Sequence, residues 1–170
     1  RDVAVTGVQT CALPIYYKRP FWAIDVWNGD HISVPNIDGP KRSLIMALKQ
    51  AELSPADIQY INAHATSTIV GDYNEALAID EVFGELKPYV GSTKSMTGHE
   101  MWMAGASEVV YSMLMMKNSF VAPTINFEKP DEASAKLNIT NKCVPFKFDT
   151  FLSNSFGFGG TNSTLIIRNL

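Results

Sequence analysis

The order of apolar segments along the chain is the feature that most restricts its fold. From about residue 21, short apolar runs alternate with longer segments whose apolar residues recur at helical spacing. We expect strands at residues 21–26, 58–63, 88–92, 151–156 and 161–168, and helices at residues 40–53, 72–83 and 98–118. Short strands that alternate with helices, followed by a closing pair of strands, predict a layered α/β fold.

Two of the expected helices carry a distinct apolar stripe, and the third has a distinct end. A stripe of this kind is the face that a helix turns toward a core. Gly84 follows the helix at 72–83 as a C-cap. The stripe residues are Leu44, Ala47, Leu48 and Ala51 in the first helix, and Ala106, Val109, Val110, Met113 and Leu114 in the last.

Composition bounds the classes of function that remain. Hydrophobic residues make up 46% of the 170 residues and charged residues 18%, which is enough apolar material for a core and excludes a disordered chain. The net charge of -3 gives no sign of a nucleic-acid surface. No apolar run approaches the ~20 residues of a membrane span. Two distant cysteines without metal-type spacing and no signal peptide predict a cytoplasmic protein.

The first residues need separate treatment. The run VTGVQTCALPI at residues 5–15 resembles the translated sequence of a sequencing-library adapter. We therefore take residues 1–15 as a non-native segment and residues 16–170 as one domain that is truncated at its N-terminus. A genuine strand, which the run VAVTGV would suit, is the alternative.

The first polar segment, NAHATST, follows the second expected strand and precedes a helix. Ligand sites gather at such strand ends in α/β sheets. His64, Thr66 and Thr68 place an imidazole and two hydroxyls there. A histidine satisfied within the core is the alternative for His64. Asp72 and Glu75, three residues apart, also fit a variant of the helix capping box.

The second polar segment, KSMTGH, follows the next strand. It places His99 at or near the N-terminus of the helix expected at residues 98–118, where the helix dipole disfavours a positive charge. We therefore expect a neutral His99 that donates a hydrogen bond, the form that stabilises a developing negative oxygen. Lys94, among small residues, is expected to be buried beside a carboxylate, with Glu75 as the candidate. A solvated surface lysine is the alternative.

The third segment, NSFGFGGTN, separates the last two strands. Gly157, Gly159 and Gly160 let the backbone bend sharply and approach a ligand. Amide groups of such a loop can form half of an oxyanion hole. A glycine-rich hairpin turn is the alternative, although two phenylalanines would be unusual in an exposed turn. Taken together, the three segments predict one site built from three strand ends.

These motifs and their spacing resemble the β-ketoacyl-acyl-carrier-protein synthases of type II fatty acid synthesis. The resemblance covers about residues 22–170, and KSMTGH with SNSFGFGGTN is closer to the synthase I and II branch than to synthase III. It implies a five-layered thiolase-like fold of two similar halves, of which this chain is the C-terminal half. It also implies a decarboxylative Claisen condensation, in which malonyl carried on acyl carrier protein lengthens an enzyme-bound acyl chain.

The resemblance also assigns roles. His64 and His99 would stabilise the enolate, and Lys94 paired with Glu75 would organise the site. Phe158, between Gly157 and Gly159, would gate the acyl pocket and lend its N–H to the oxyanion hole, while Thr66 and Thr68 would contact the pantetheine arm. The residues implied as ligands of a structural Na⁺ or K⁺ are Asn62, Ala63, Glu108, Ser153 and Asn154.

The same resemblance implies partners and no bound cofactor. The 4′-phosphopantetheine arm belongs to the partner acyl carrier protein, and the full-length enzyme would be a homodimer. The family's nucleophilic cysteine lies in the first half, and neither Cys11 nor Cys143 matches it. The chain alone is therefore expected to be inactive.

Several positions depart from the family pattern. Trp102 stands where glycine is usual, within a stretch in which Glu-Met-Trp-Met replaces Ser-Leu-Gly-Ala. It would reshape the acyl pocket or the helix packing, or have no effect on substrate. Ala65 replaces a common glycine and needs only an ordinary φ.

Three other interpretations of the chain stay open. One is a non-catalytic partner resembling a chain-length factor, and another is a polyketide ketosynthase. The third is a plain α/β domain without this chemistry. Both histidines and the lysine are retained, and this favours the enzyme.

Overall fold

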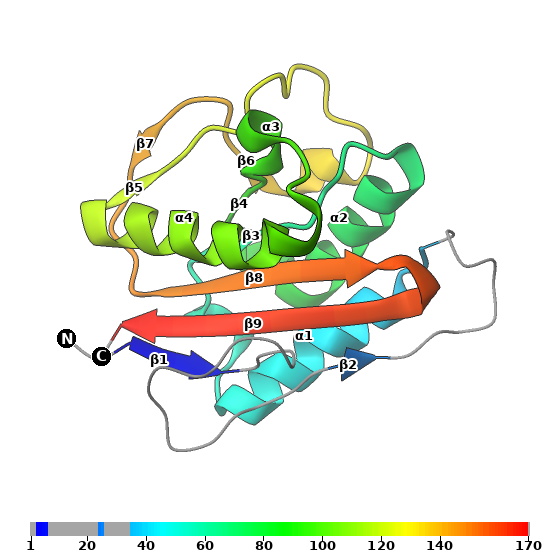
Figure 1. Ribbon diagram of the computed structural model, residues 1–170, viewed down its shortest axis with the longest axis horizontal. Helices are drawn as coiled ribbons and strands as arrows, with labels where there is room; N and C mark the ends of the chain where they lie inside the picture. Colours follow the sequence, from blue (N-terminus) through cyan, green and yellow to red (C-terminus); the bar gives the residue numbers. More distant parts are fainter. Residues whose placement is uncertain (1–2, 7–23, 26–34, 170) are drawn as a thin grey trace.

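A mixed β-sheet forms the centre of the chain, for which the computed structural model describes residues 3–6, 24–25 and 35–169 (Figure 1). Within those residues the sheet has seven strands in the order β1-β9-β8-β3-β4-β6, and β2 also pairs with β9. The strands are β1 (Val3–Thr6), β2 (Ile24–Asp25), β3 (Tyr60–Asn62), β4 (Tyr89–Gly91), β6 (Asn138–Ile139), β8 (Thr150–Gly157) and β9 (Thr161–Asn169). A separate antiparallel pair is formed by β5 (Phe120–Val121) and β7 (Val144–Pro145).

The sheet combines parallel and antiparallel pairing in a way that gathers strand ends at one edge. β3 runs parallel to both β4 and β8, whereas β8 and β9 form an antiparallel hairpin. Asn62 at the end of β3 lies in register with Gly91 of β4 and with Ser153 of β8. β3 and β4 therefore end at the same edge of the sheet, and β8 runs in the same direction and continues beyond them to Gly157.

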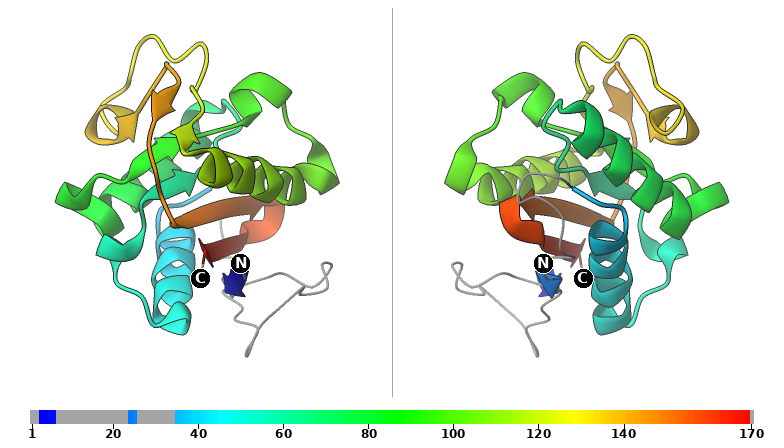
Figure 2. Two further views of the ribbon diagram at one scale, coloured as in Figure 1. Left: turned by 90° about the vertical axis from the view of Figure 1, so that its left-hand side faces the viewer. Right: turned by 90° about the vertical axis from the view of Figure 1, so that its right-hand side faces the viewer.

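Helices cover both faces of the sheet (Figure 2). On one face, α1 (Asp38–Ala51) and α2 (Ile69–Phe83) pack on a core that includes Ile61, Leu152 and Ile166. On the other, α4 (Ala104–Asn118) packs on a core that includes Phe148 and Phe151. The described part of the chain is thus a layered α/β structure, which agrees with the predicted fold class.

The short elements complete the chain. A four-residue helix, α3 (Lys94–Thr97), follows β4. Single turns of 3-10 helix are η1 (Pro55–Asp57), η2 (Gly84–Leu86), η3 (Met101–Met103), η4 (Ser134–Lys136) and η5 (Phe158–Gly160). Ser54 and Asp57 form a capping box around η1, where the sequence places a turn.

Most predicted elements are confirmed, with shifted ends. The stripe of the first helix is buried at Leu44, Ala47 and Leu48. Helix α2 begins at Ile69, earlier than predicted, and ends on Gly84 at φ 44°, a backbone conformation that favours glycine. Of the predicted strand at residues 21–26 only β2 lies within the described residues.

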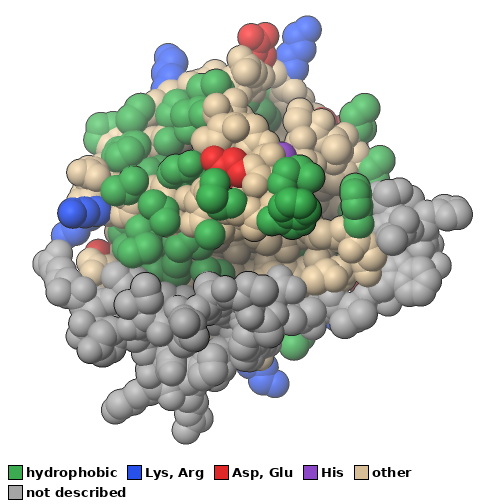
Figure 3. Space-filling view, in the orientation of Figure 1, with side chains coloured by type: hydrophobic (Ala, Val, Ile, Leu, Met, Phe, Trp, Pro, Cys, Tyr) green, Lys and Arg blue, Asp and Glu red, His purple; other side chains and the backbone are tan. Residues whose placement is uncertain are grey.

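The helix predicted at residues 98–118 is wrong in its start and in its buried face. Gly98 has φ 73° and the continuous helix α4 begins only at Ala104. Its buried positions include Glu108 and Ser112. Val110 and Leu114 of the predicted stripe are 53% and 49% exposed. Figure 3 shows apolar side chains gathered over this side of the molecule.

The assignment of residues 1–15 to a non-native segment stays a prediction. Within it only β1 is described, paired antiparallel with β9 at the end of the sheet. Cys11 lies outside the described residues. In the part of the chain that is described, no helix has the length and apolar character needed to cross a membrane.

Candidate active site

The imidazoles of His64 and His99 meet at the edge where β3 and β4 end. His64 lies on the loop after β3, and His99 follows the short helix α3 that begins just after β4. Their ring centroids are 5.6 Å apart and the ring planes are nearly perpendicular, at 87°. The two histidines that the sequence places on separate loops are therefore neighbours, close enough for one small ligand to contact both.

His64 lies in surroundings that keep it uncharged. Burial lowers the pKa of His64 to about 3, and the nearby positive charge of Lys94 and the proximity of His99 act in the same direction. The ring of Phe156 lies on another side, with centroids 6.0 Å apart. His64 Nδ1 is buried without a hydrogen-bond partner among the described residues. A neutral imidazole can donate a hydrogen bond but brings no charge of its own.

His99 is held differently from the sequence prediction. It lies between α3 and η3, five residues before α4, so the argument from the dipole of a long helix does not apply to it. Its Nδ1 accepts a hydrogen bond from the backbone N–H of Met101 at 3.2 Å. A ring nitrogen that accepts carries no proton, so the proton of the neutral ring is on Nε2. Met101 has φ 53°, an uncommon conformation for a residue with a side chain.

The predicted pairing of Lys94 with Glu75 is wrong, because the carboxylate that binds Lys94 is Glu108. Lys94 Nζ donates to Glu108 Oε1, and their side chains are only 4% and 2% exposed. The prediction that Lys94 is buried beside a carboxylate is confirmed. Glu108 comes from α4, which covers the other face of the sheet from α2 and Glu75. The sequence analysis named Glu108 only as a cation ligand.

Glu75 instead fixes the backbone of the His64 loop. Its Oε1 accepts the N–H of His64 at 2.9 Å and Nδ2 of Asn154 at 3.0 Å, and its Oε2 accepts the N–H of Ala65 at 2.8 Å. Burial raises the pKa of Glu75, and these donors and Lys94 oppose that rise. Ala65 is absent from the described residues with positive φ, as expected for its position.

The start of α2 settles the capping question and leaves two hydroxyls accessible. Thr68, not Asp72, occupies the N-cap position. Asp72 Oδ1 accepts the N–H of Thr68 at 3.3 Å, so its carboxylate supports the loop from inside the first turn. The hydroxyls of Thr66 and Thr68 lie 3.3 Å apart. Thr68 is exposed and Thr66 half-buried, and their contact with a pantetheine arm stays a prediction.

The glycine-rich segment forms the turn between β8 and β9. Gly159 and Gly160 have φ 78° and 75°, so the turn needs glycine there. Phe158 at its tip is 81% exposed, and its roles as gate and oxyanion donor stay predictions. The sequence analysis missed Phe156, the residue of this segment whose ring lies against His64. Its place near the end of β8, two residues before the turn that begins at Phe158, is the only signal for it.

The residues predicted to hold a monovalent cation divide between the two faces of the sheet. Side chains alternate along a strand. Ile61 and Leu152 belong to the core under α1 and α2, so Asn62 and Ser153 point toward α4 and Asn154 points away. The Asn154 amide also has both of its polar atoms hydrogen-bonded, Nδ2 to Glu75 and Oδ1 to Thr164. Its side chain is therefore engaged elsewhere, and the place of Asn154 in the cation set stays a prediction.

The α4 side, by contrast, has the oxygen atoms that a cation needs. Both polar atoms of the Asn62 side chain, Glu108 Oε2 and the hydroxyl of Ser112 are buried without a hydrogen-bond partner among the described residues. Buried polar groups are normally paired, so these atoms indicate a missing partner on this face. Among residues 3–6, 24–25 and 35–169, no group of three or more His, Cys, Asp or Glu fits a metal ion. The donor set suits a monovalent ion.

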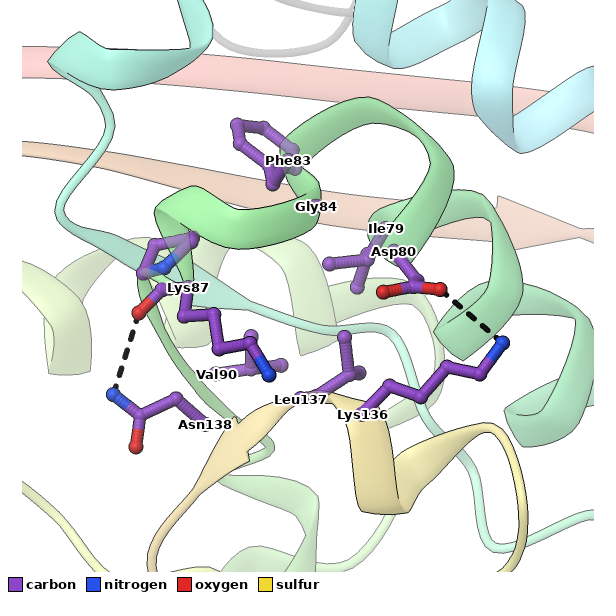
Figure 4. Close-up of a pocket in the computed structure, with 10 residues that line it drawn as sticks. Ile79, Asp80, Phe83, Gly84, Lys87, Val90, Lys136, Leu137 and Asn138 are labelled. Atoms are coloured by element: carbon purple, nitrogen blue, oxygen red, sulfur yellow. Dashed lines mark hydrogen bonds and ion pairs between the residues drawn. The ribbon is translucent and has the colours of Figure 1, made fainter.

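A small cavity lies elsewhere in the fold (Figure 4). It holds about 10 Å³, room for roughly one water molecule, and lies between the end of α2 and the segment that contains η4 and β6. The ion pair of Lys136 with Asp80 and the hydrogen bond from Asn138 to the Lys87 carbonyl lie on either side of it. None of its lining residues belongs to the histidine site.

Comparison with known proteins gives consistent matches. Residues 24–128 match the model of the β-ketoacyl synthase C-terminal domain. The chain is 45% identical to 3-oxoacyl-[acyl-carrier-protein] synthase 1 of Escherichia coli over 143 residues, which are 84% of the chain and 34% of that protein. It is also 45% identical, over 135 residues, to synthase 2 of Coxiella burnetii, covering 78% and 33% of the two chains. The chain thus spans about a third of the length of these relatives.

Solved structures agree in fold. A β-ketoacyl synthase from Burkholderia phymatum aligns with a TM-score of 0.82 at 36% identity, covering 87% of this chain and 36% of that one. A type II polyketide ketosynthase bound to a hexaketide, in complex with its acyl-carrier protein, gives 0.81 at 37% identity, covering 87% and 37%. A ketosynthase from Xenorhabdus doucetiae in complex with its chain length factor gives 0.75 at 33% identity, covering 82% and 36%.

Proposed function

Since this chain belongs to the β-ketoacyl synthase family through its C-terminal domain, we propose that it is part of an enzyme that lengthens acyl chains held on acyl carrier protein. The observation that carries this proposal is the pair of imidazoles 5.6 Å apart, one of them kept neutral by burial and by Lys94. Two imidazole donors this close together suit an oxygen that becomes negative during reaction.

The reaction that fits this pair is loss of carbon dioxide from a malonyl thioester. The bond between the methylene carbon and the carboxylate breaks, and its electron pair moves into the thioester as an enolate. His99 donates from Nε2, and His64 donates from its own N–H, to the oxygen that carries the new charge. No proton needs to leave either ring for this step.

Carbon–carbon bond formation then needs a second thioester. The enolate carbon attacks the carbonyl carbon of an acyl group held on a cysteine, and the cysteine thiolate leaves. Cys143 is an exposed free cysteine beside β7 and belongs to none of the three polar segments. We therefore propose that the nucleophile comes from a part of the enzyme outside this chain and that this chain alone is inactive.

Partners follow from the same chemistry. Acyl carrier protein delivers both thioesters on its phosphopantetheine arm, and the accessible hydroxyls of Thr66 and Thr68 beside His64 suit that arm. The solved ketosynthase complex with its acyl-carrier protein supports this partner. Action in the cytoplasm and assembly as a homodimer complete the proposal. Sedimentation of the full-length protein tests the dimer.

A bound Na⁺ or K⁺ would satisfy the unpaired atoms on the α4 side. Asn62 Oδ1 and Glu108 Oε2 would hold it, with Ser153 and the Ala63 carbonyl nearby, and it would supply a fixed positive charge that stiffens the site. The melting temperature of the full-length protein should then be higher in KCl than in tetramethylammonium chloride of equal ionic strength. Equal values in the two salts would remove this part of the proposal.

The test of the main function uses the full-length protein and malonyl-acyl carrier protein. Carbon dioxide release should fall by about 10²- to 10³-fold in His64→Ala and in His99→Ala, because each change removes one donor. Circular dichroism shows whether the variants remain folded. Full decarboxylase activity in both folded variants would contradict the proposal.

A non-catalytic partner of a synthase is the second candidate, favoured by the similarity to a ketosynthase that works with a chain length factor. Retention of both histidines and of Lys94 opposes it. The same assay separates the two candidates. A folded wild-type protein that releases no carbon dioxide, but binds and activates a separate synthase, would favour the partner role.

A further inference from the structure

A line of buried hydrogen bonds runs along one face of the sheet, from α1 to the His64 loop. Ser43 Oγ donates to Thr164 Oγ1 at 2.9 Å, Thr164 Oγ1 donates to Asn154 Oδ1 at 3.0 Å, and Asn154 Nδ2 donates to Glu75 Oε1 at 3.0 Å. All four side chains are between 0% and 4% exposed. The line joins α1, β9, β8 and α2, and it ends on the carboxylate that holds the backbone of His64.

Every donor along this line points toward Glu75. Thr164 accepts from Ser43, so its own proton is available for Asn154. With its oxygen occupied by Thr164, the amide of Asn154 turns its NH₂ group toward Glu75. A turned amide would set its oxygen against the carboxylate, and two acceptors repel each other. Hydrogen bonds in such a chain polarise one another, most strongly where water is excluded.

We propose that Thr164 is a positioning residue for His64 that acts through Asn154 and Glu75. The inference rests on the proposed function, because it concerns how the donor pair is aimed. Nothing in Thr164 touches the histidine. Its hydroxyl sets the orientation of the Asn154 amide, which sets one oxygen of Glu75, and Glu75 fixes the two backbone N–H groups at His64 and Ala65.

Loss of the Thr164 hydroxyl should change the position of the His64 donor and not the binding of the substrate. Without the hydroxyl, Asn154 Oδ1 is buried and unpaired, and its amide is free to turn away from Glu75. Glu75 then keeps only its two backbone donors, and the loop that carries His64 gains freedom. A catalytic donor displaced by about 1 Å can cost ~10²-fold in rate. Thr164 is not among the residues proposed to contact the carrier protein or its arm, so substrate binding should change little.

The test replaces Thr164 in the full-length protein and measures decarboxylation of malonyl-acyl carrier protein. Thr164→Val keeps the shape and removes the hydroxyl, so kcat should fall by about 10- to 100-fold while KM changes by less than about twofold. Thr164→Ser keeps the hydroxyl and should restore most of kcat. A fall in kcat that Ser does not rescue would overturn the proposal.

A matched control lies on the same hairpin. Thr150 is 2% exposed, and its hydroxyl accepts a hydrogen bond from Arg168 Nε at 3.0 Å, remote from Glu75. Thr150→Val should therefore lower the melting temperature without lowering kcat. If Thr164→Val only matches Thr150→Val in kcat, the proposal is overturned. Should Thr164→Val not fold, Thr164→Ala removes the same hydroxyl, and an unchanged kcat there also overturns the proposal.

Carbon dioxide release by the wild-type protein distinguishes a failure of this inference from a failure of the proposed function. A wild-type enzyme that does not release carbon dioxide contradicts the proposed function. A wild-type enzyme that does, together with a Thr164→Val variant as fast as wild type, contradicts only the positioning role of Thr164.

Discussion

His64 illustrates how the surroundings of one residue set its charge. Unperturbed histidines gain a proton near pH 6.5. Burial, with Lys94 and His99 nearby, lowers the pKa of His64 to about 3. The folded protein therefore holds His64 neutral from about pH 4 to pH 6.5, where the same residue in an unfolded chain becomes protonated. The neutral ring is the form that the proposed decarboxylation uses.

We expect the His64 ring to remain uncharged down to about pH 4. Because its folded pKa lies below its unfolded pKa, the unfolded state binds more protons between about pH 3 and pH 6.5. This residue therefore lowers the stability of the fold as the solution becomes more acid. Nuclear magnetic resonance of ring-labelled full-length protein measures the titration, with the urea-unfolded protein as control. A folded-state midpoint near pH 6 would contradict the expectation.

At the scale of elements, the sequence locates a helix with one apolar face or a strand with a short apolar run. It does not locate the buried face of a helix that is apolar on most sides. Helix α1 has a single core to face, so its apolar stripe places it correctly. The central strands β3 and β8 are covered on both faces, and their short, nearly continuous apolar runs mark them instead. Helix α4 carries apolar side chains around most of its surface and buries the polar Glu108 and Ser112. Periodicity therefore selects its exposed Val110 and Leu114 as the core face.

The site shows the same division. Polar residues that follow apolar strands mark the two histidine loops, because parallel strands end at one edge. The partner of Lys94 does not follow from such local signals. The chain has 17 acidic residues, and which of them meets Lys94 depends on the side of the sheet that each helix covers. Gly98, with its positive φ, ends the short helix before His99, and no periodicity reveals that break.

The Lys94–Glu108 ion pair joins α3 to α4. Replacing one partner, and then both, tests how much the pair contributes to stability. Lys94→Met leaves a buried carboxylate without its counter-charge, so the free energy of unfolding should fall by about 3–5 kcal/mol. Lys94→Met combined with Glu108→Leu should recover much of that loss. Urea denaturation of the full-length protein measures both.

The exposed pair of Lys41 and Glu81 is the control for this prediction. These side chains are 36% and 46% exposed, and water screens their attraction. Lys41→Met should change stability far less than Lys94→Met. A double variant no more stable than Lys94→Met alone would contradict the view that the unpaired charge is what costs stability.

At the scale of the whole molecule, apolar surface is left uncovered beside the site. Met101, Trp102 and Met103 are 66%, 102% and 60% exposed, and Val110 and Leu114 of α4 are exposed as well. Figure 3 shows apolar side chains gathered on the α4 side of the molecule. Trp102, expected to need room within the packing, is fully exposed. Monomeric soluble proteins rarely expose large apolar patches, and about two thirds of the length of the E. coli relative lies beyond the part that this chain matches.

We therefore expect residues 16–170, produced alone, to self-associate and to bind a hydrophobic dye. The α4 side should be responsible, so Val110→Gln with Leu114→Gln should reduce both effects. Ile45→Gln with Met46→Gln is the matched control, because these α1 residues are 47% and 38% exposed but lie on the opposite face of the sheet. Sedimentation velocity measures the association. A wild-type fragment that is monomeric and unfolds cooperatively would show that α4 needs no cover, and the fragment would then be a domain complete in itself.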